Sequence, residues 1–273
     1  MWYMPISSES IFKTHLNYIR CVSNQYSGLS LTTSLTPTSL LPTTNIVRFK
    51  KLADLTAKSI EIELRASSFE HEYAQIIVGW IPVKCYYRVY YLESILIYLL
   101  NGNSIGFSRG GHKGVRKAIS ILINNNELTF SNVNISTQST ISMIRTHKIA
   151  SGANLSPNYY LSDDCVHSVR KKICEYQEHD WKDGRNIKTY NTAASRASRD
   201  NYYATSTLNL TDFFYWMRIK VNYKDLDFLD FPSAGTSDDA FNYVKSYIDA
   251  YQSYSSALEN MISHLLEMRR MST

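Results

Sequence analysis

The segment FFYWMRIKVNYKDLDF, residues 213–228, places groups that could bind an anion in one of the most apolar stretches of the chain. It contains Arg218, followed by Asn222 four residues later and by Asp225 seven residues later. In a helix these three polar groups form one stripe that borders the apolar face. The chemistry open to such a stripe is the binding of an anion such as phosphate by the guanidinium.

Arg218 has a structural interpretation and a functional one. Burying a guanidinium is unfavourable unless it is paired and hydrogen-bonded, so an ion pair with Asp225 or another acid could hold helices in register. Alternatively, Arg218 faces a cleft between helices or subunits, where its planar fork fits a phosphate. The spacing alone favours the structural pair of Arg218 with Asp225.

The composition predicts a mostly helical protein with a substantial core. The chain has 273 residues, of which 44% are hydrophobic and 19% are charged, and it contains 21 tyrosines but only 10 glycines and 6 prolines. Few helix-breaking residues and several long apolar runs favour helices. The net charge of +5 permits binding to nucleic acid without requiring it.

Secretion, a membrane span and a metal site are not expected. The N-terminal residues lack a long apolar stretch after a basic start, and no run reaches about 18 apolar residues. Cys165, His167, Cys174 and His179 are competent zinc ligands, but their spacing matches none of the usual paired patterns. We therefore expect a cytoplasmic protein with reduced thiols and without a metal or another cofactor.

Hydrophobic periodicity and capping residues predict the helices that would position these groups. The expected helices cover residues 6–26, 46–65, 67–79, 82–100, a segment from His112, a segment after Ser162, a segment from about 209 or 211, and 238–270 with Ser237 as its cap. Residues 27–45 are rich in Ser, Thr and Pro and are expected to form a loop. Residues 132–144 could form a strand or a loop, and the basic, polar stretch 183–207 is expected to be mobile.

Two further groups of basic residues could contact nucleic acid. The motif RGGHKGVRK places five residues close to a helix N-terminus, whose amides could join them in binding phosphate: Arg109, His112, Lys113, Arg116 and Lys117. A second group lies among aromatic residues, a pattern typical of a surface that follows a nucleic-acid backbone and stacks on bases. Its members are Arg170, Lys171, Lys172, Arg185, Arg196 and Arg199. For both groups the simpler interpretation, a solvated loop or insertion, is the one that the sequence favours.

Four motifs, in this order, resemble the HEPN superfamily of small helical domains. They are VKCYYRVYYLESILIYLLNG, HKGVRKAISILI, FFYWMRIKVNYKDLDF and SDDAFNYVKSYIDAYQSYSSALENMI, and they cover about residues 82–123 and 209–266. The resemblance implies an all-α, up-and-down helical bundle that forms a homodimer or a higher oligomer. On this basis we divide the chain into an N-terminal helical extension, 1–80, and a HEPN-like domain, 81–273, with an irregular insertion at about 124–208.

The resemblance also implies a site. Many members of the superfamily are metal-independent ribonucleases in which an Arg is followed, after four to six residues, by a His, and two copies of this motif meet across a dimer cleft. Arg218 matches the Arg, but Tyr223 stands where the His is expected, with Asn222 beside it. A tyrosine with its usual pKa of about 10 is a poor proton acceptor at neutral pH, so the motif is degenerate. His112 is a further, less favoured contributor to the site. The insertion contains His147, His167 and His179, any of which could supply the missing His.

Two hypotheses for the function follow. The first is an RNA-targeting effector or toxin of a bacterial defence or toxin–antitoxin system, which acts as a ribonuclease and has an antitoxin or another defence protein as its partner. The second is a non-catalytic HEPN-like subunit that docks on a partner and holds Arg218 in a buried ion pair. Exposure of Arg218 in a basic pocket would favour the ribonuclease. A third hypothesis, a DNA-binding module, lacks a recognisable recognition-helix motif.

Overall fold

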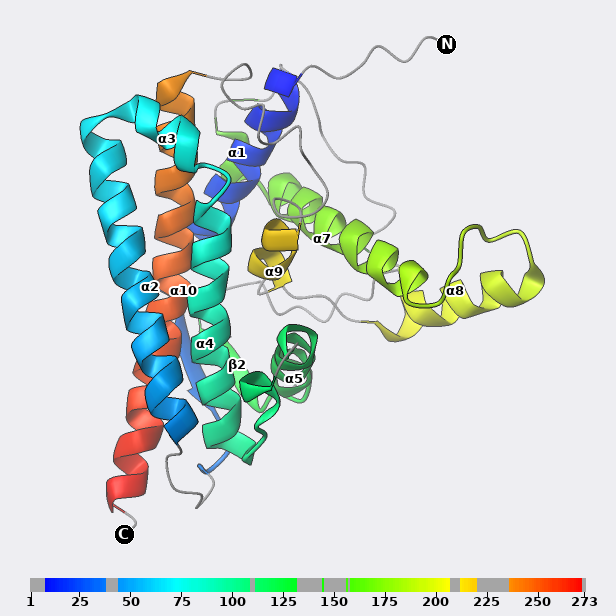
Figure 1. Ribbon diagram of the computed structural model, residues 1–273. Coiled ribbons are helices and arrows are strands. Elements are labelled where there is room, and N and C mark those ends of the chain that lie inside the picture. Colours follow the sequence, from blue (N-terminus) through cyan, green and yellow to red (C-terminus); the bar gives the residue numbers. More distant parts are fainter. Residues whose placement is uncertain are drawn as a thin grey trace.

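Helices dominate the computed structural model, which describes residues 8–37, 44–108, 111–131, 144, 156, 158–206, 212–219 and 236–271 (Figure 1). The all-α prediction is confirmed, since the described residues form helices and one small two-stranded sheet. In chain order the elements are α1 (Ser8–Tyr26), β1 (Ser30–Thr33), α2 (Thr44–Phe69), α3 (His71–Ile77), α4 (Ile81–Asn101), η1 (Ile105–Phe107), α5 (His112–Asn124), β2 (Leu128–Ser131), η3 (Tyr159–Leu161), α7 (Asp163–Asp183), α8 (Ala193–Thr205), α9 (Asp212–Ile219) and α10 (Ser237–Met271).

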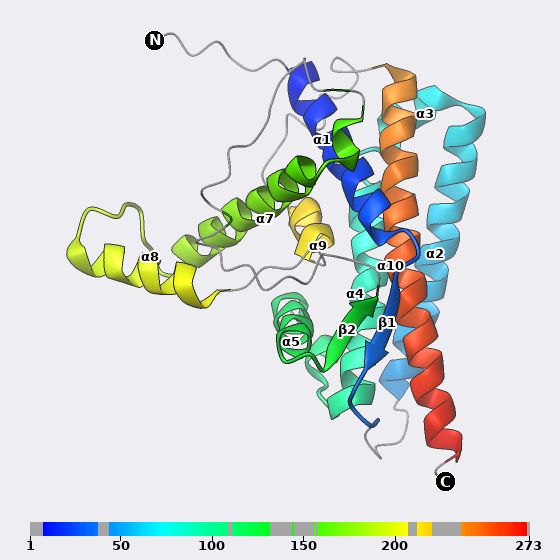
Figure 2. The ribbon, with the colours of Figure 1, turned by 180° about the vertical axis from the view of Figure 1, so that it is seen from behind.

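Helix α4 lies at the centre of the fold. It packs against α2 and α10, while α5 and α9 lie against its other faces (Figures 1 and 2). Its sequence explains this position, because the helix is apolar on nearly every side and most of its residues are buried. Pro82 stands in its first turn, and Gly102 ends it with a φ of 73°, a left-handed conformation that glycine adopts without strain.

Helix α10 contributes a row of buried tyrosines to the core. Tyr243, Tyr247, Tyr251 and Tyr254 recur at a spacing of three or four residues, and each is almost inaccessible to solvent. Tyr254 stacks on Tyr26 of α1, with the ring centroids 5.6 Å apart. Tyrosine rings bury a large apolar area, but their hydroxyls need partners when they are buried.

A partly buried ion pair connects α4 to α10. Arg88 Nη2 lies 2.7 Å from Oε1 of Glu259, and Arg88 Nη1 donates to the hydroxyls of Tyr251 and Ser255. Such a pair contributes specificity more reliably than net stability, because desolvating both charges offsets much of their attraction. The arginine that interrupts this apolar helix therefore orients α4 against α10.

The two N-terminal helices pack into the same core. Helix α1 lies along α10, and α2 lies along α4. Ile19 and Val22 of α1 and Ala53 and Ile60 of α2 are fully buried there. The domain boundary at residue 80 stays a prediction.

The stretch 27–45, expected to be a loop, contains strand β1 and the start of α2. Strand β1 pairs with β2 in antiparallel register, from Ser30 opposite Ser131 to Thr33 opposite Leu128. The partner strand lies about 100 residues further along the chain, so no local pattern of residues indicates the pairing. This sheet lies against α10.

Residues 183–207, for which the sequence predicts a mobile stretch, contain α8. Thr192 and Ser195 form a reciprocal capping box at its start: Thr192 Oγ1 accepts from the Ser195 amide at 3.1 Å, and Ser195 Oγ accepts from the Thr192 amide at 3.2 Å. Tyr203 is the buried residue of α8, which explains why apolar periodicity does not reveal the helix. Helix α8 lies beyond the far end of α7 from the bundle (Figures 1 and 2).

The expected start of α7 agrees with the structure, and the expected cap of α10 differs by one residue. Helix α7 begins directly after Ser162, as expected, and Ser162 Oγ caps it by accepting from the amide of Cys165. The cap of α10 is Thr236 rather than Ser237, because Thr236 Oγ1 accepts from the Asp239 amide at 3.1 Å and the Asp239 carboxylate accepts from the Thr236 amide at 3.3 Å. The segment 132–144, apart from its last residue, lies outside the described residues.

Candidate functional site

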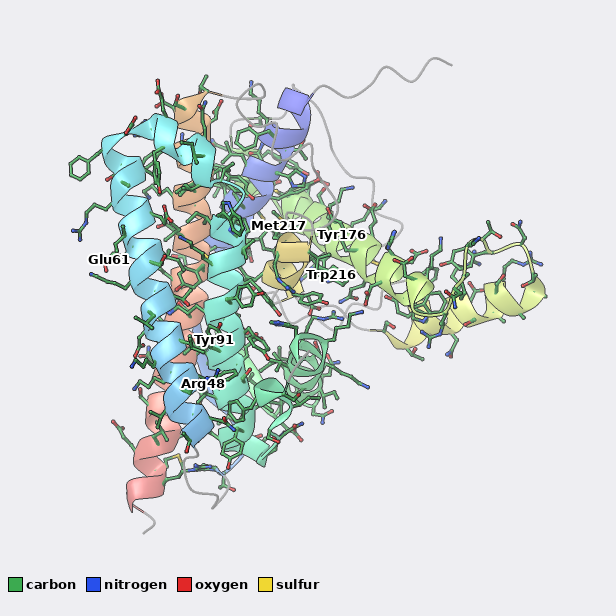
Figure 3. The ribbon with its side chains drawn as sticks, viewed as in Figure 1. Arg48, Glu61, Tyr91, Tyr176, Trp216 and Met217 are labelled. Atoms are coloured by element: carbon green, nitrogen blue, oxygen red, sulfur yellow. The ribbon has the colours of Figure 1, made fainter. Side chains whose placement is uncertain are left out.

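Helix α9 carries Arg218 in its last turn and is enclosed by its neighbours. Phe214 and Met217 are buried, so the helix has no solvated face of the usual kind. Trp216 stacks on Tyr176 of α7 with ring centroids 5.9 Å apart, and Figure 3 shows both side chains between the two helices. This packing fixes the position of Arg218.

The guanidinium of Arg218 lies over two tyrosine rings of α4. Its central carbon, Cζ, is 5.0 Å from the ring centroid of Tyr86 and 5.4 Å from that of Tyr87. Ring faces attract a cation, and they do so more strongly where water is excluded. Arg218 is only 7% exposed, so these contacts help to compensate its loss of hydration.

His112, the first residue of α5, borders on the same tyrosines. Its Nδ1 lies 2.8 Å from the hydroxyl oxygen of Tyr86, and its ring centroid is 4.1 Å from that of Tyr90. Burial and, to a smaller extent, the positive charge of Arg218 lower the pKa of His112 to about 4. The imidazole is therefore neutral at pH 7. The fold thus brings together His112 and Arg218, which belong to separate sequence motifs.

Tyr86 connects these two groups. Burial and the nearby Glu93 carboxyl raise the pKa of Tyr86, so its hydroxyl keeps its proton at neutral pH. The hydroxyl can donate to Nδ1 of His112, or it can accept from an Nδ1–H group. In the second arrangement Nε2 of His112 is unprotonated and can act as a general base.

A network of buried carboxyls lies behind this cluster. The Tyr254 hydroxyl donates to Glu93 Oε1 at 2.8 Å, and Gln177 Nε2 donates to Asp212 Oδ2 at 2.9 Å. Arg116 Nη1 lies 3.5 Å from Asp212 Oδ1. Burial raises the pKa of Glu93 to about 8, and the charge of Asp212 adds to this, while Tyr254 and Arg116 oppose it. Glu93 is therefore mostly protonated at pH 7, and Asp212 with Arg116 forms the charged pair.

A small cavity joins the carboxyl network to His112. Its volume of about 10 Å³ is close to the space that one water molecule needs. Its walls include Tyr86, Glu93, His112, Arg116 and Tyr215. Polar groups from α4, α5 and α9 thus surround a space of about the size of one water molecule beside the imidazole.

An open groove of about 680 Å³ lies between α5, α7 and α8, and we call it the α5–α8 groove. Four cationic residues line it, namely Lys113, Arg116, Lys117 and Arg185, and a single acid, Asp180, lies among them. Lys113 Nζ lies 2.8 Å from Asp180 Oδ1. The groove is therefore positively charged and open to an anionic ligand.

Two aromatic rings form part of the wall of the α5–α8 groove. Trp181 of α7 and Tyr202 of α8 stack at 4.5 Å with an angle of 16° between their planes. The guanidinium of Arg185 lies over Trp181, 4.9 Å from the ring centroid. Both rings are partly exposed, so the groove offers flat apolar surface beside its cations.

The basic residues singled out in the sequence have different surroundings. Lys113 and Arg185 line the α5–α8 groove. Arg170 is buried, and Lys172 Nζ lies 2.7 Å from Glu175 Oε2. Arg170, Lys171 and Lys172 all precede the part of α7 that borders the groove.

Two arginines of α8 contact the chain around them rather than the groove wall. Arg196 Nη1 donates to the carbonyls of Tyr190 and Asn191. Arg199 Nη2 lies 2.7 Å from Asp200, and its guanidinium lies over the Tyr190 ring. These contacts hold the segment that precedes α8 against the helix.

Several candidate residues lie outside the described residues. They are Arg109, Asn222, Tyr223 and Asp225. The Arg218–Asp225 pair and the auxiliary roles of Asn222 and Tyr223 therefore stay predictions.

Sequence reasoning missed Tyr86, Glu93 and Asp212 as members of the site, and it placed Arg116 only in the basic group at the helix N-terminus. Glu93 had a recognisable signal, because a carboxyl in the middle of a largely apolar helix needs a buried partner. Arg116 stands four residues after His112 on the same face of α5. Nothing local marked Tyr86 among its neighbouring tyrosines.

The zinc alternative and a membrane span receive no support from the part of the chain that the structure describes. No group of three potential metal ligands occurs among those residues, and Cys165 and Cys174 are buried and form no disulfide. Likewise, no described helix has both the length and the apolar character that crossing a bilayer requires.

The fold and the site define a class by structure alone: an all-α protein with an Arg–Tyr–His cluster beside a basic, aromatic groove. Comparison with protein-family models, with curated proteins and with solved structures found no match.

Proposed function

We propose that this protein is a HEPN-like, RNA-targeting effector that cleaves RNA without a metal ion, with Arg218 and His112 as its central pair. It would act in the cytoplasm, as the cysteine pattern suggests, and as a homodimer within a defence or toxin–antitoxin system, as the resemblance implies. The observation that carries the proposal is the contact of both residues with Tyr86. Tyr86 thereby holds a neutral imidazole beside a guanidinium, whereas the degenerate Arg–His motif has only Tyr223 in the place of its His.

The proposed reaction uses the ribose 2′-hydroxyl as the nucleophile. His112 Nε2 takes its proton while the 2′-oxygen attacks the phosphorus. The bond between phosphorus and the 5′-oxygen breaks, which leaves a 2′,3′-cyclic phosphate, and the 5′-oxygen takes a proton from Tyr223 or from water. The charge of Arg218 stabilises the negative charge that grows on the phosphate, with Asn222 as an auxiliary donor. This charge acts strongly because its surroundings are low in polarity.

The test is cleavage of total RNA by purified protein in the presence of EDTA. Wild type is compared with His112→Gln and Arg218→Lys, and each variant is checked for its oligomeric state and its midpoint of thermal unfolding. The matched controls are His264→Gln on α10 and Arg65→Lys on α2, which change the same residue types at exposed positions. We expect the two site variants to lose about 100-fold or more in rate and the controls to match wild type.

The proposal is abandoned if well-folded wild type shows no cleavage, or if His112→Gln cleaves as fast as wild type. Cleavage that requires a divalent cation would also contradict it. Products ending in 2′,3′-cyclic phosphate are expected, and a 5′-phosphate product would point to another mechanism.

A non-catalytic, partner-binding subunit is the second candidate function, and the burial of Arg218 favours it. At 7% exposure, with its guanidinium over Tyr86 and Tyr87, Arg218 has surroundings that suit a structural residue. In this case Arg218→Lys lowers the midpoint of unfolding or dissociates the oligomer, and wild type does not cleave RNA. The same set of proteins thus distinguishes the two functions.

A further inference from the structure

We propose that the α5–α8 groove binds single-stranded RNA and directs the strand toward His112. This inference rests on the proposed function, because it assigns the substrate path of that site. The groove lies between α5 and the two helices of the insertion, so the insertion would provide the substrate-binding surface.

The charge of the groove suits a phosphate backbone. Lys113, Arg116 and Lys117 lie on α5, and Arg185 lies in the turn just after the end of α7. Asp180 pairs with Lys113, and Asp212, the partner of Arg116, is only 1% exposed. The solvent-facing charge of the groove is thus mainly positive, as needed to displace counterions from a nucleic-acid strand.

The aromatic pair suits unpaired bases. Trp181 and Tyr202 already stack on each other, and the guanidinium of Arg185 covers part of Trp181. A base can extend such a stack or slip between a ring and a guanidinium, as it does on surfaces that bind single strands. A duplex keeps its bases stacked on each other and cannot use this surface in the same way.

The groove adjoins the candidate catalytic cluster through Arg116. Lys113 follows His112 directly in the chain. Arg116 lines both the groove and the small cavity whose wall includes His112. A strand whose phosphates contact Lys113 and Arg116 would thus pass close to the start of α5, where His112 lies.

The test measures binding separately from cleavage. A fluorescently labelled single-stranded RNA of 12 uridines is titrated with the His112→Gln protein in EDTA, and anisotropy is recorded at several salt concentrations. Into this protein we introduce Lys117→Glu with Arg185→Glu, or Trp181→Ala. The matched control is Lys50→Glu with Lys51→Glu on α2, which makes the same charge change on the far side of the bundle (Figures 1 and 2).

We expect the groove double variant to bind about tenfold or more weakly and the α2 control to stay within about twofold of its parent. The slope of log affinity against log salt should become shallower by roughly 0.7 for each phosphate that the variant no longer neutralises. Trp181→Ala should weaken binding about tenfold, with the fold checked by thermal unfolding. A duplex of the same length should bind more weakly than the single strand.

Equal weakening of binding in the groove variant and the α2 control would overturn the proposal, as would equal affinity for the duplex. Binding that depends on the groove without any cleavage by wild type would leave the groove standing and refute the ribonuclease. Cleavage by wild type together with unchanged binding in the groove variants would support the ribonuclease and refute the groove as its RNA-binding surface.

Discussion

The hydroxyl oxygen of Tyr86 lies 2.8 Å from Nδ1 of His112, which connects the first half of α4 to the first residue of α5. The same ring carries the guanidinium of Arg218 on its face. One side chain thus uses its polar atom for the imidazole and its π face for the cation. The ring and the hydroxyl can be separated by mutation.

Tyr86→Phe should impair cleavage far more than stability. The phenyl ring still supports Arg218, but the hydrogen bond that orients His112 is removed, so we expect cleavage to fall about tenfold or more. The free energy of unfolding should fall by about 0.5–1.5 kcal/mol, the usual contribution of one hydrogen bond. Urea unfolding and RNA cleavage measure the two effects. The control is Tyr91→Phe, a partly buried tyrosine of the same helix that lies farther along it (Figure 3). Full activity in Tyr86→Phe would show that the hydrogen bond from Tyr86 is not needed to orient His112.

The titration of His112 tests its electrostatic coupling to Arg218. We expect an NMR titration to give a pKa near 4 for His112 in the native protein. Arg218→Gln removes a positive charge, so the pKa should rise, but it should stay below 6.5 because burial is the larger cause of the shift. Arg185→Gln, at the far end of α7, is the control and should leave the value unchanged. An unaltered pKa in Arg218→Gln would mean that the two residues are not electrostatically coupled.

The same shift predicts how stability depends on acid. The native pKa of about 4 lies below the ordinary value of 6.5, so between these two values the unfolded chain binds the proton that native His112 refuses. Proton uptake by the unfolded chain favours unfolding, so the free energy of unfolding should decrease as the pH falls from about 6.5 to about 4. His112→Gln should flatten the dependence over this window, whereas parallel curves for wild type and variant would contradict the shift.

The long helices could be predicted from the sequence because their signals are local. Helix α4 is largely apolar between Pro82 and Gly102, and α7 begins directly after Ser162. The pairing of β1 with β2 could not be predicted, since it depends on two short strands meeting across most of the N-terminal half of the chain. Helix α8 could not be predicted from hydrophobic periodicity, because little of its surface is buried and a capping box stabilises its start.

The candidate site could be predicted only in part, for a related reason. His112 and Arg218 were each recognisable as unusual residues in their own segments. Their meeting at Tyr86 depends on how α9 and α5 pack against α4, which no spacing within one motif encodes. The link between Arg116 and Asp212 is of the same kind, since two partners on different helices define it.

Glu93→Gln should stabilise the protein more as the pH rises. Native Glu93 has a pKa of about 8 against an ordinary value of 4.5, so between these values the unfolded chain releases a proton that the native chain retains. Stability is therefore lost through this group as the pH rises from about 4.5 to about 8. Glutamine keeps the acceptor for the Tyr254 hydroxyl and has no proton to lose. Because one pKa unit corresponds to about 1.4 kcal/mol, the variant should gain on the order of 1–3 kcal/mol over wild type between pH 5 and pH 7.5.

The control for Glu93 is Glu259→Gln, which removes the carboxylate paired with Arg88 and should show no such gain. A difference between wild type and Glu93→Gln that does not vary with pH would contradict the raised pKa. The protonation of Glu93 also bears on catalysis, because an ionised carboxylate across the small cavity would raise the pKa of His112. The NMR titration of His112 should therefore give the same pKa in Glu93→Gln as in wild type. A lower value in the variant would mean that Glu93 is charged in the native protein and that the imidazole is less available as a neutral base than the proposed reaction requires.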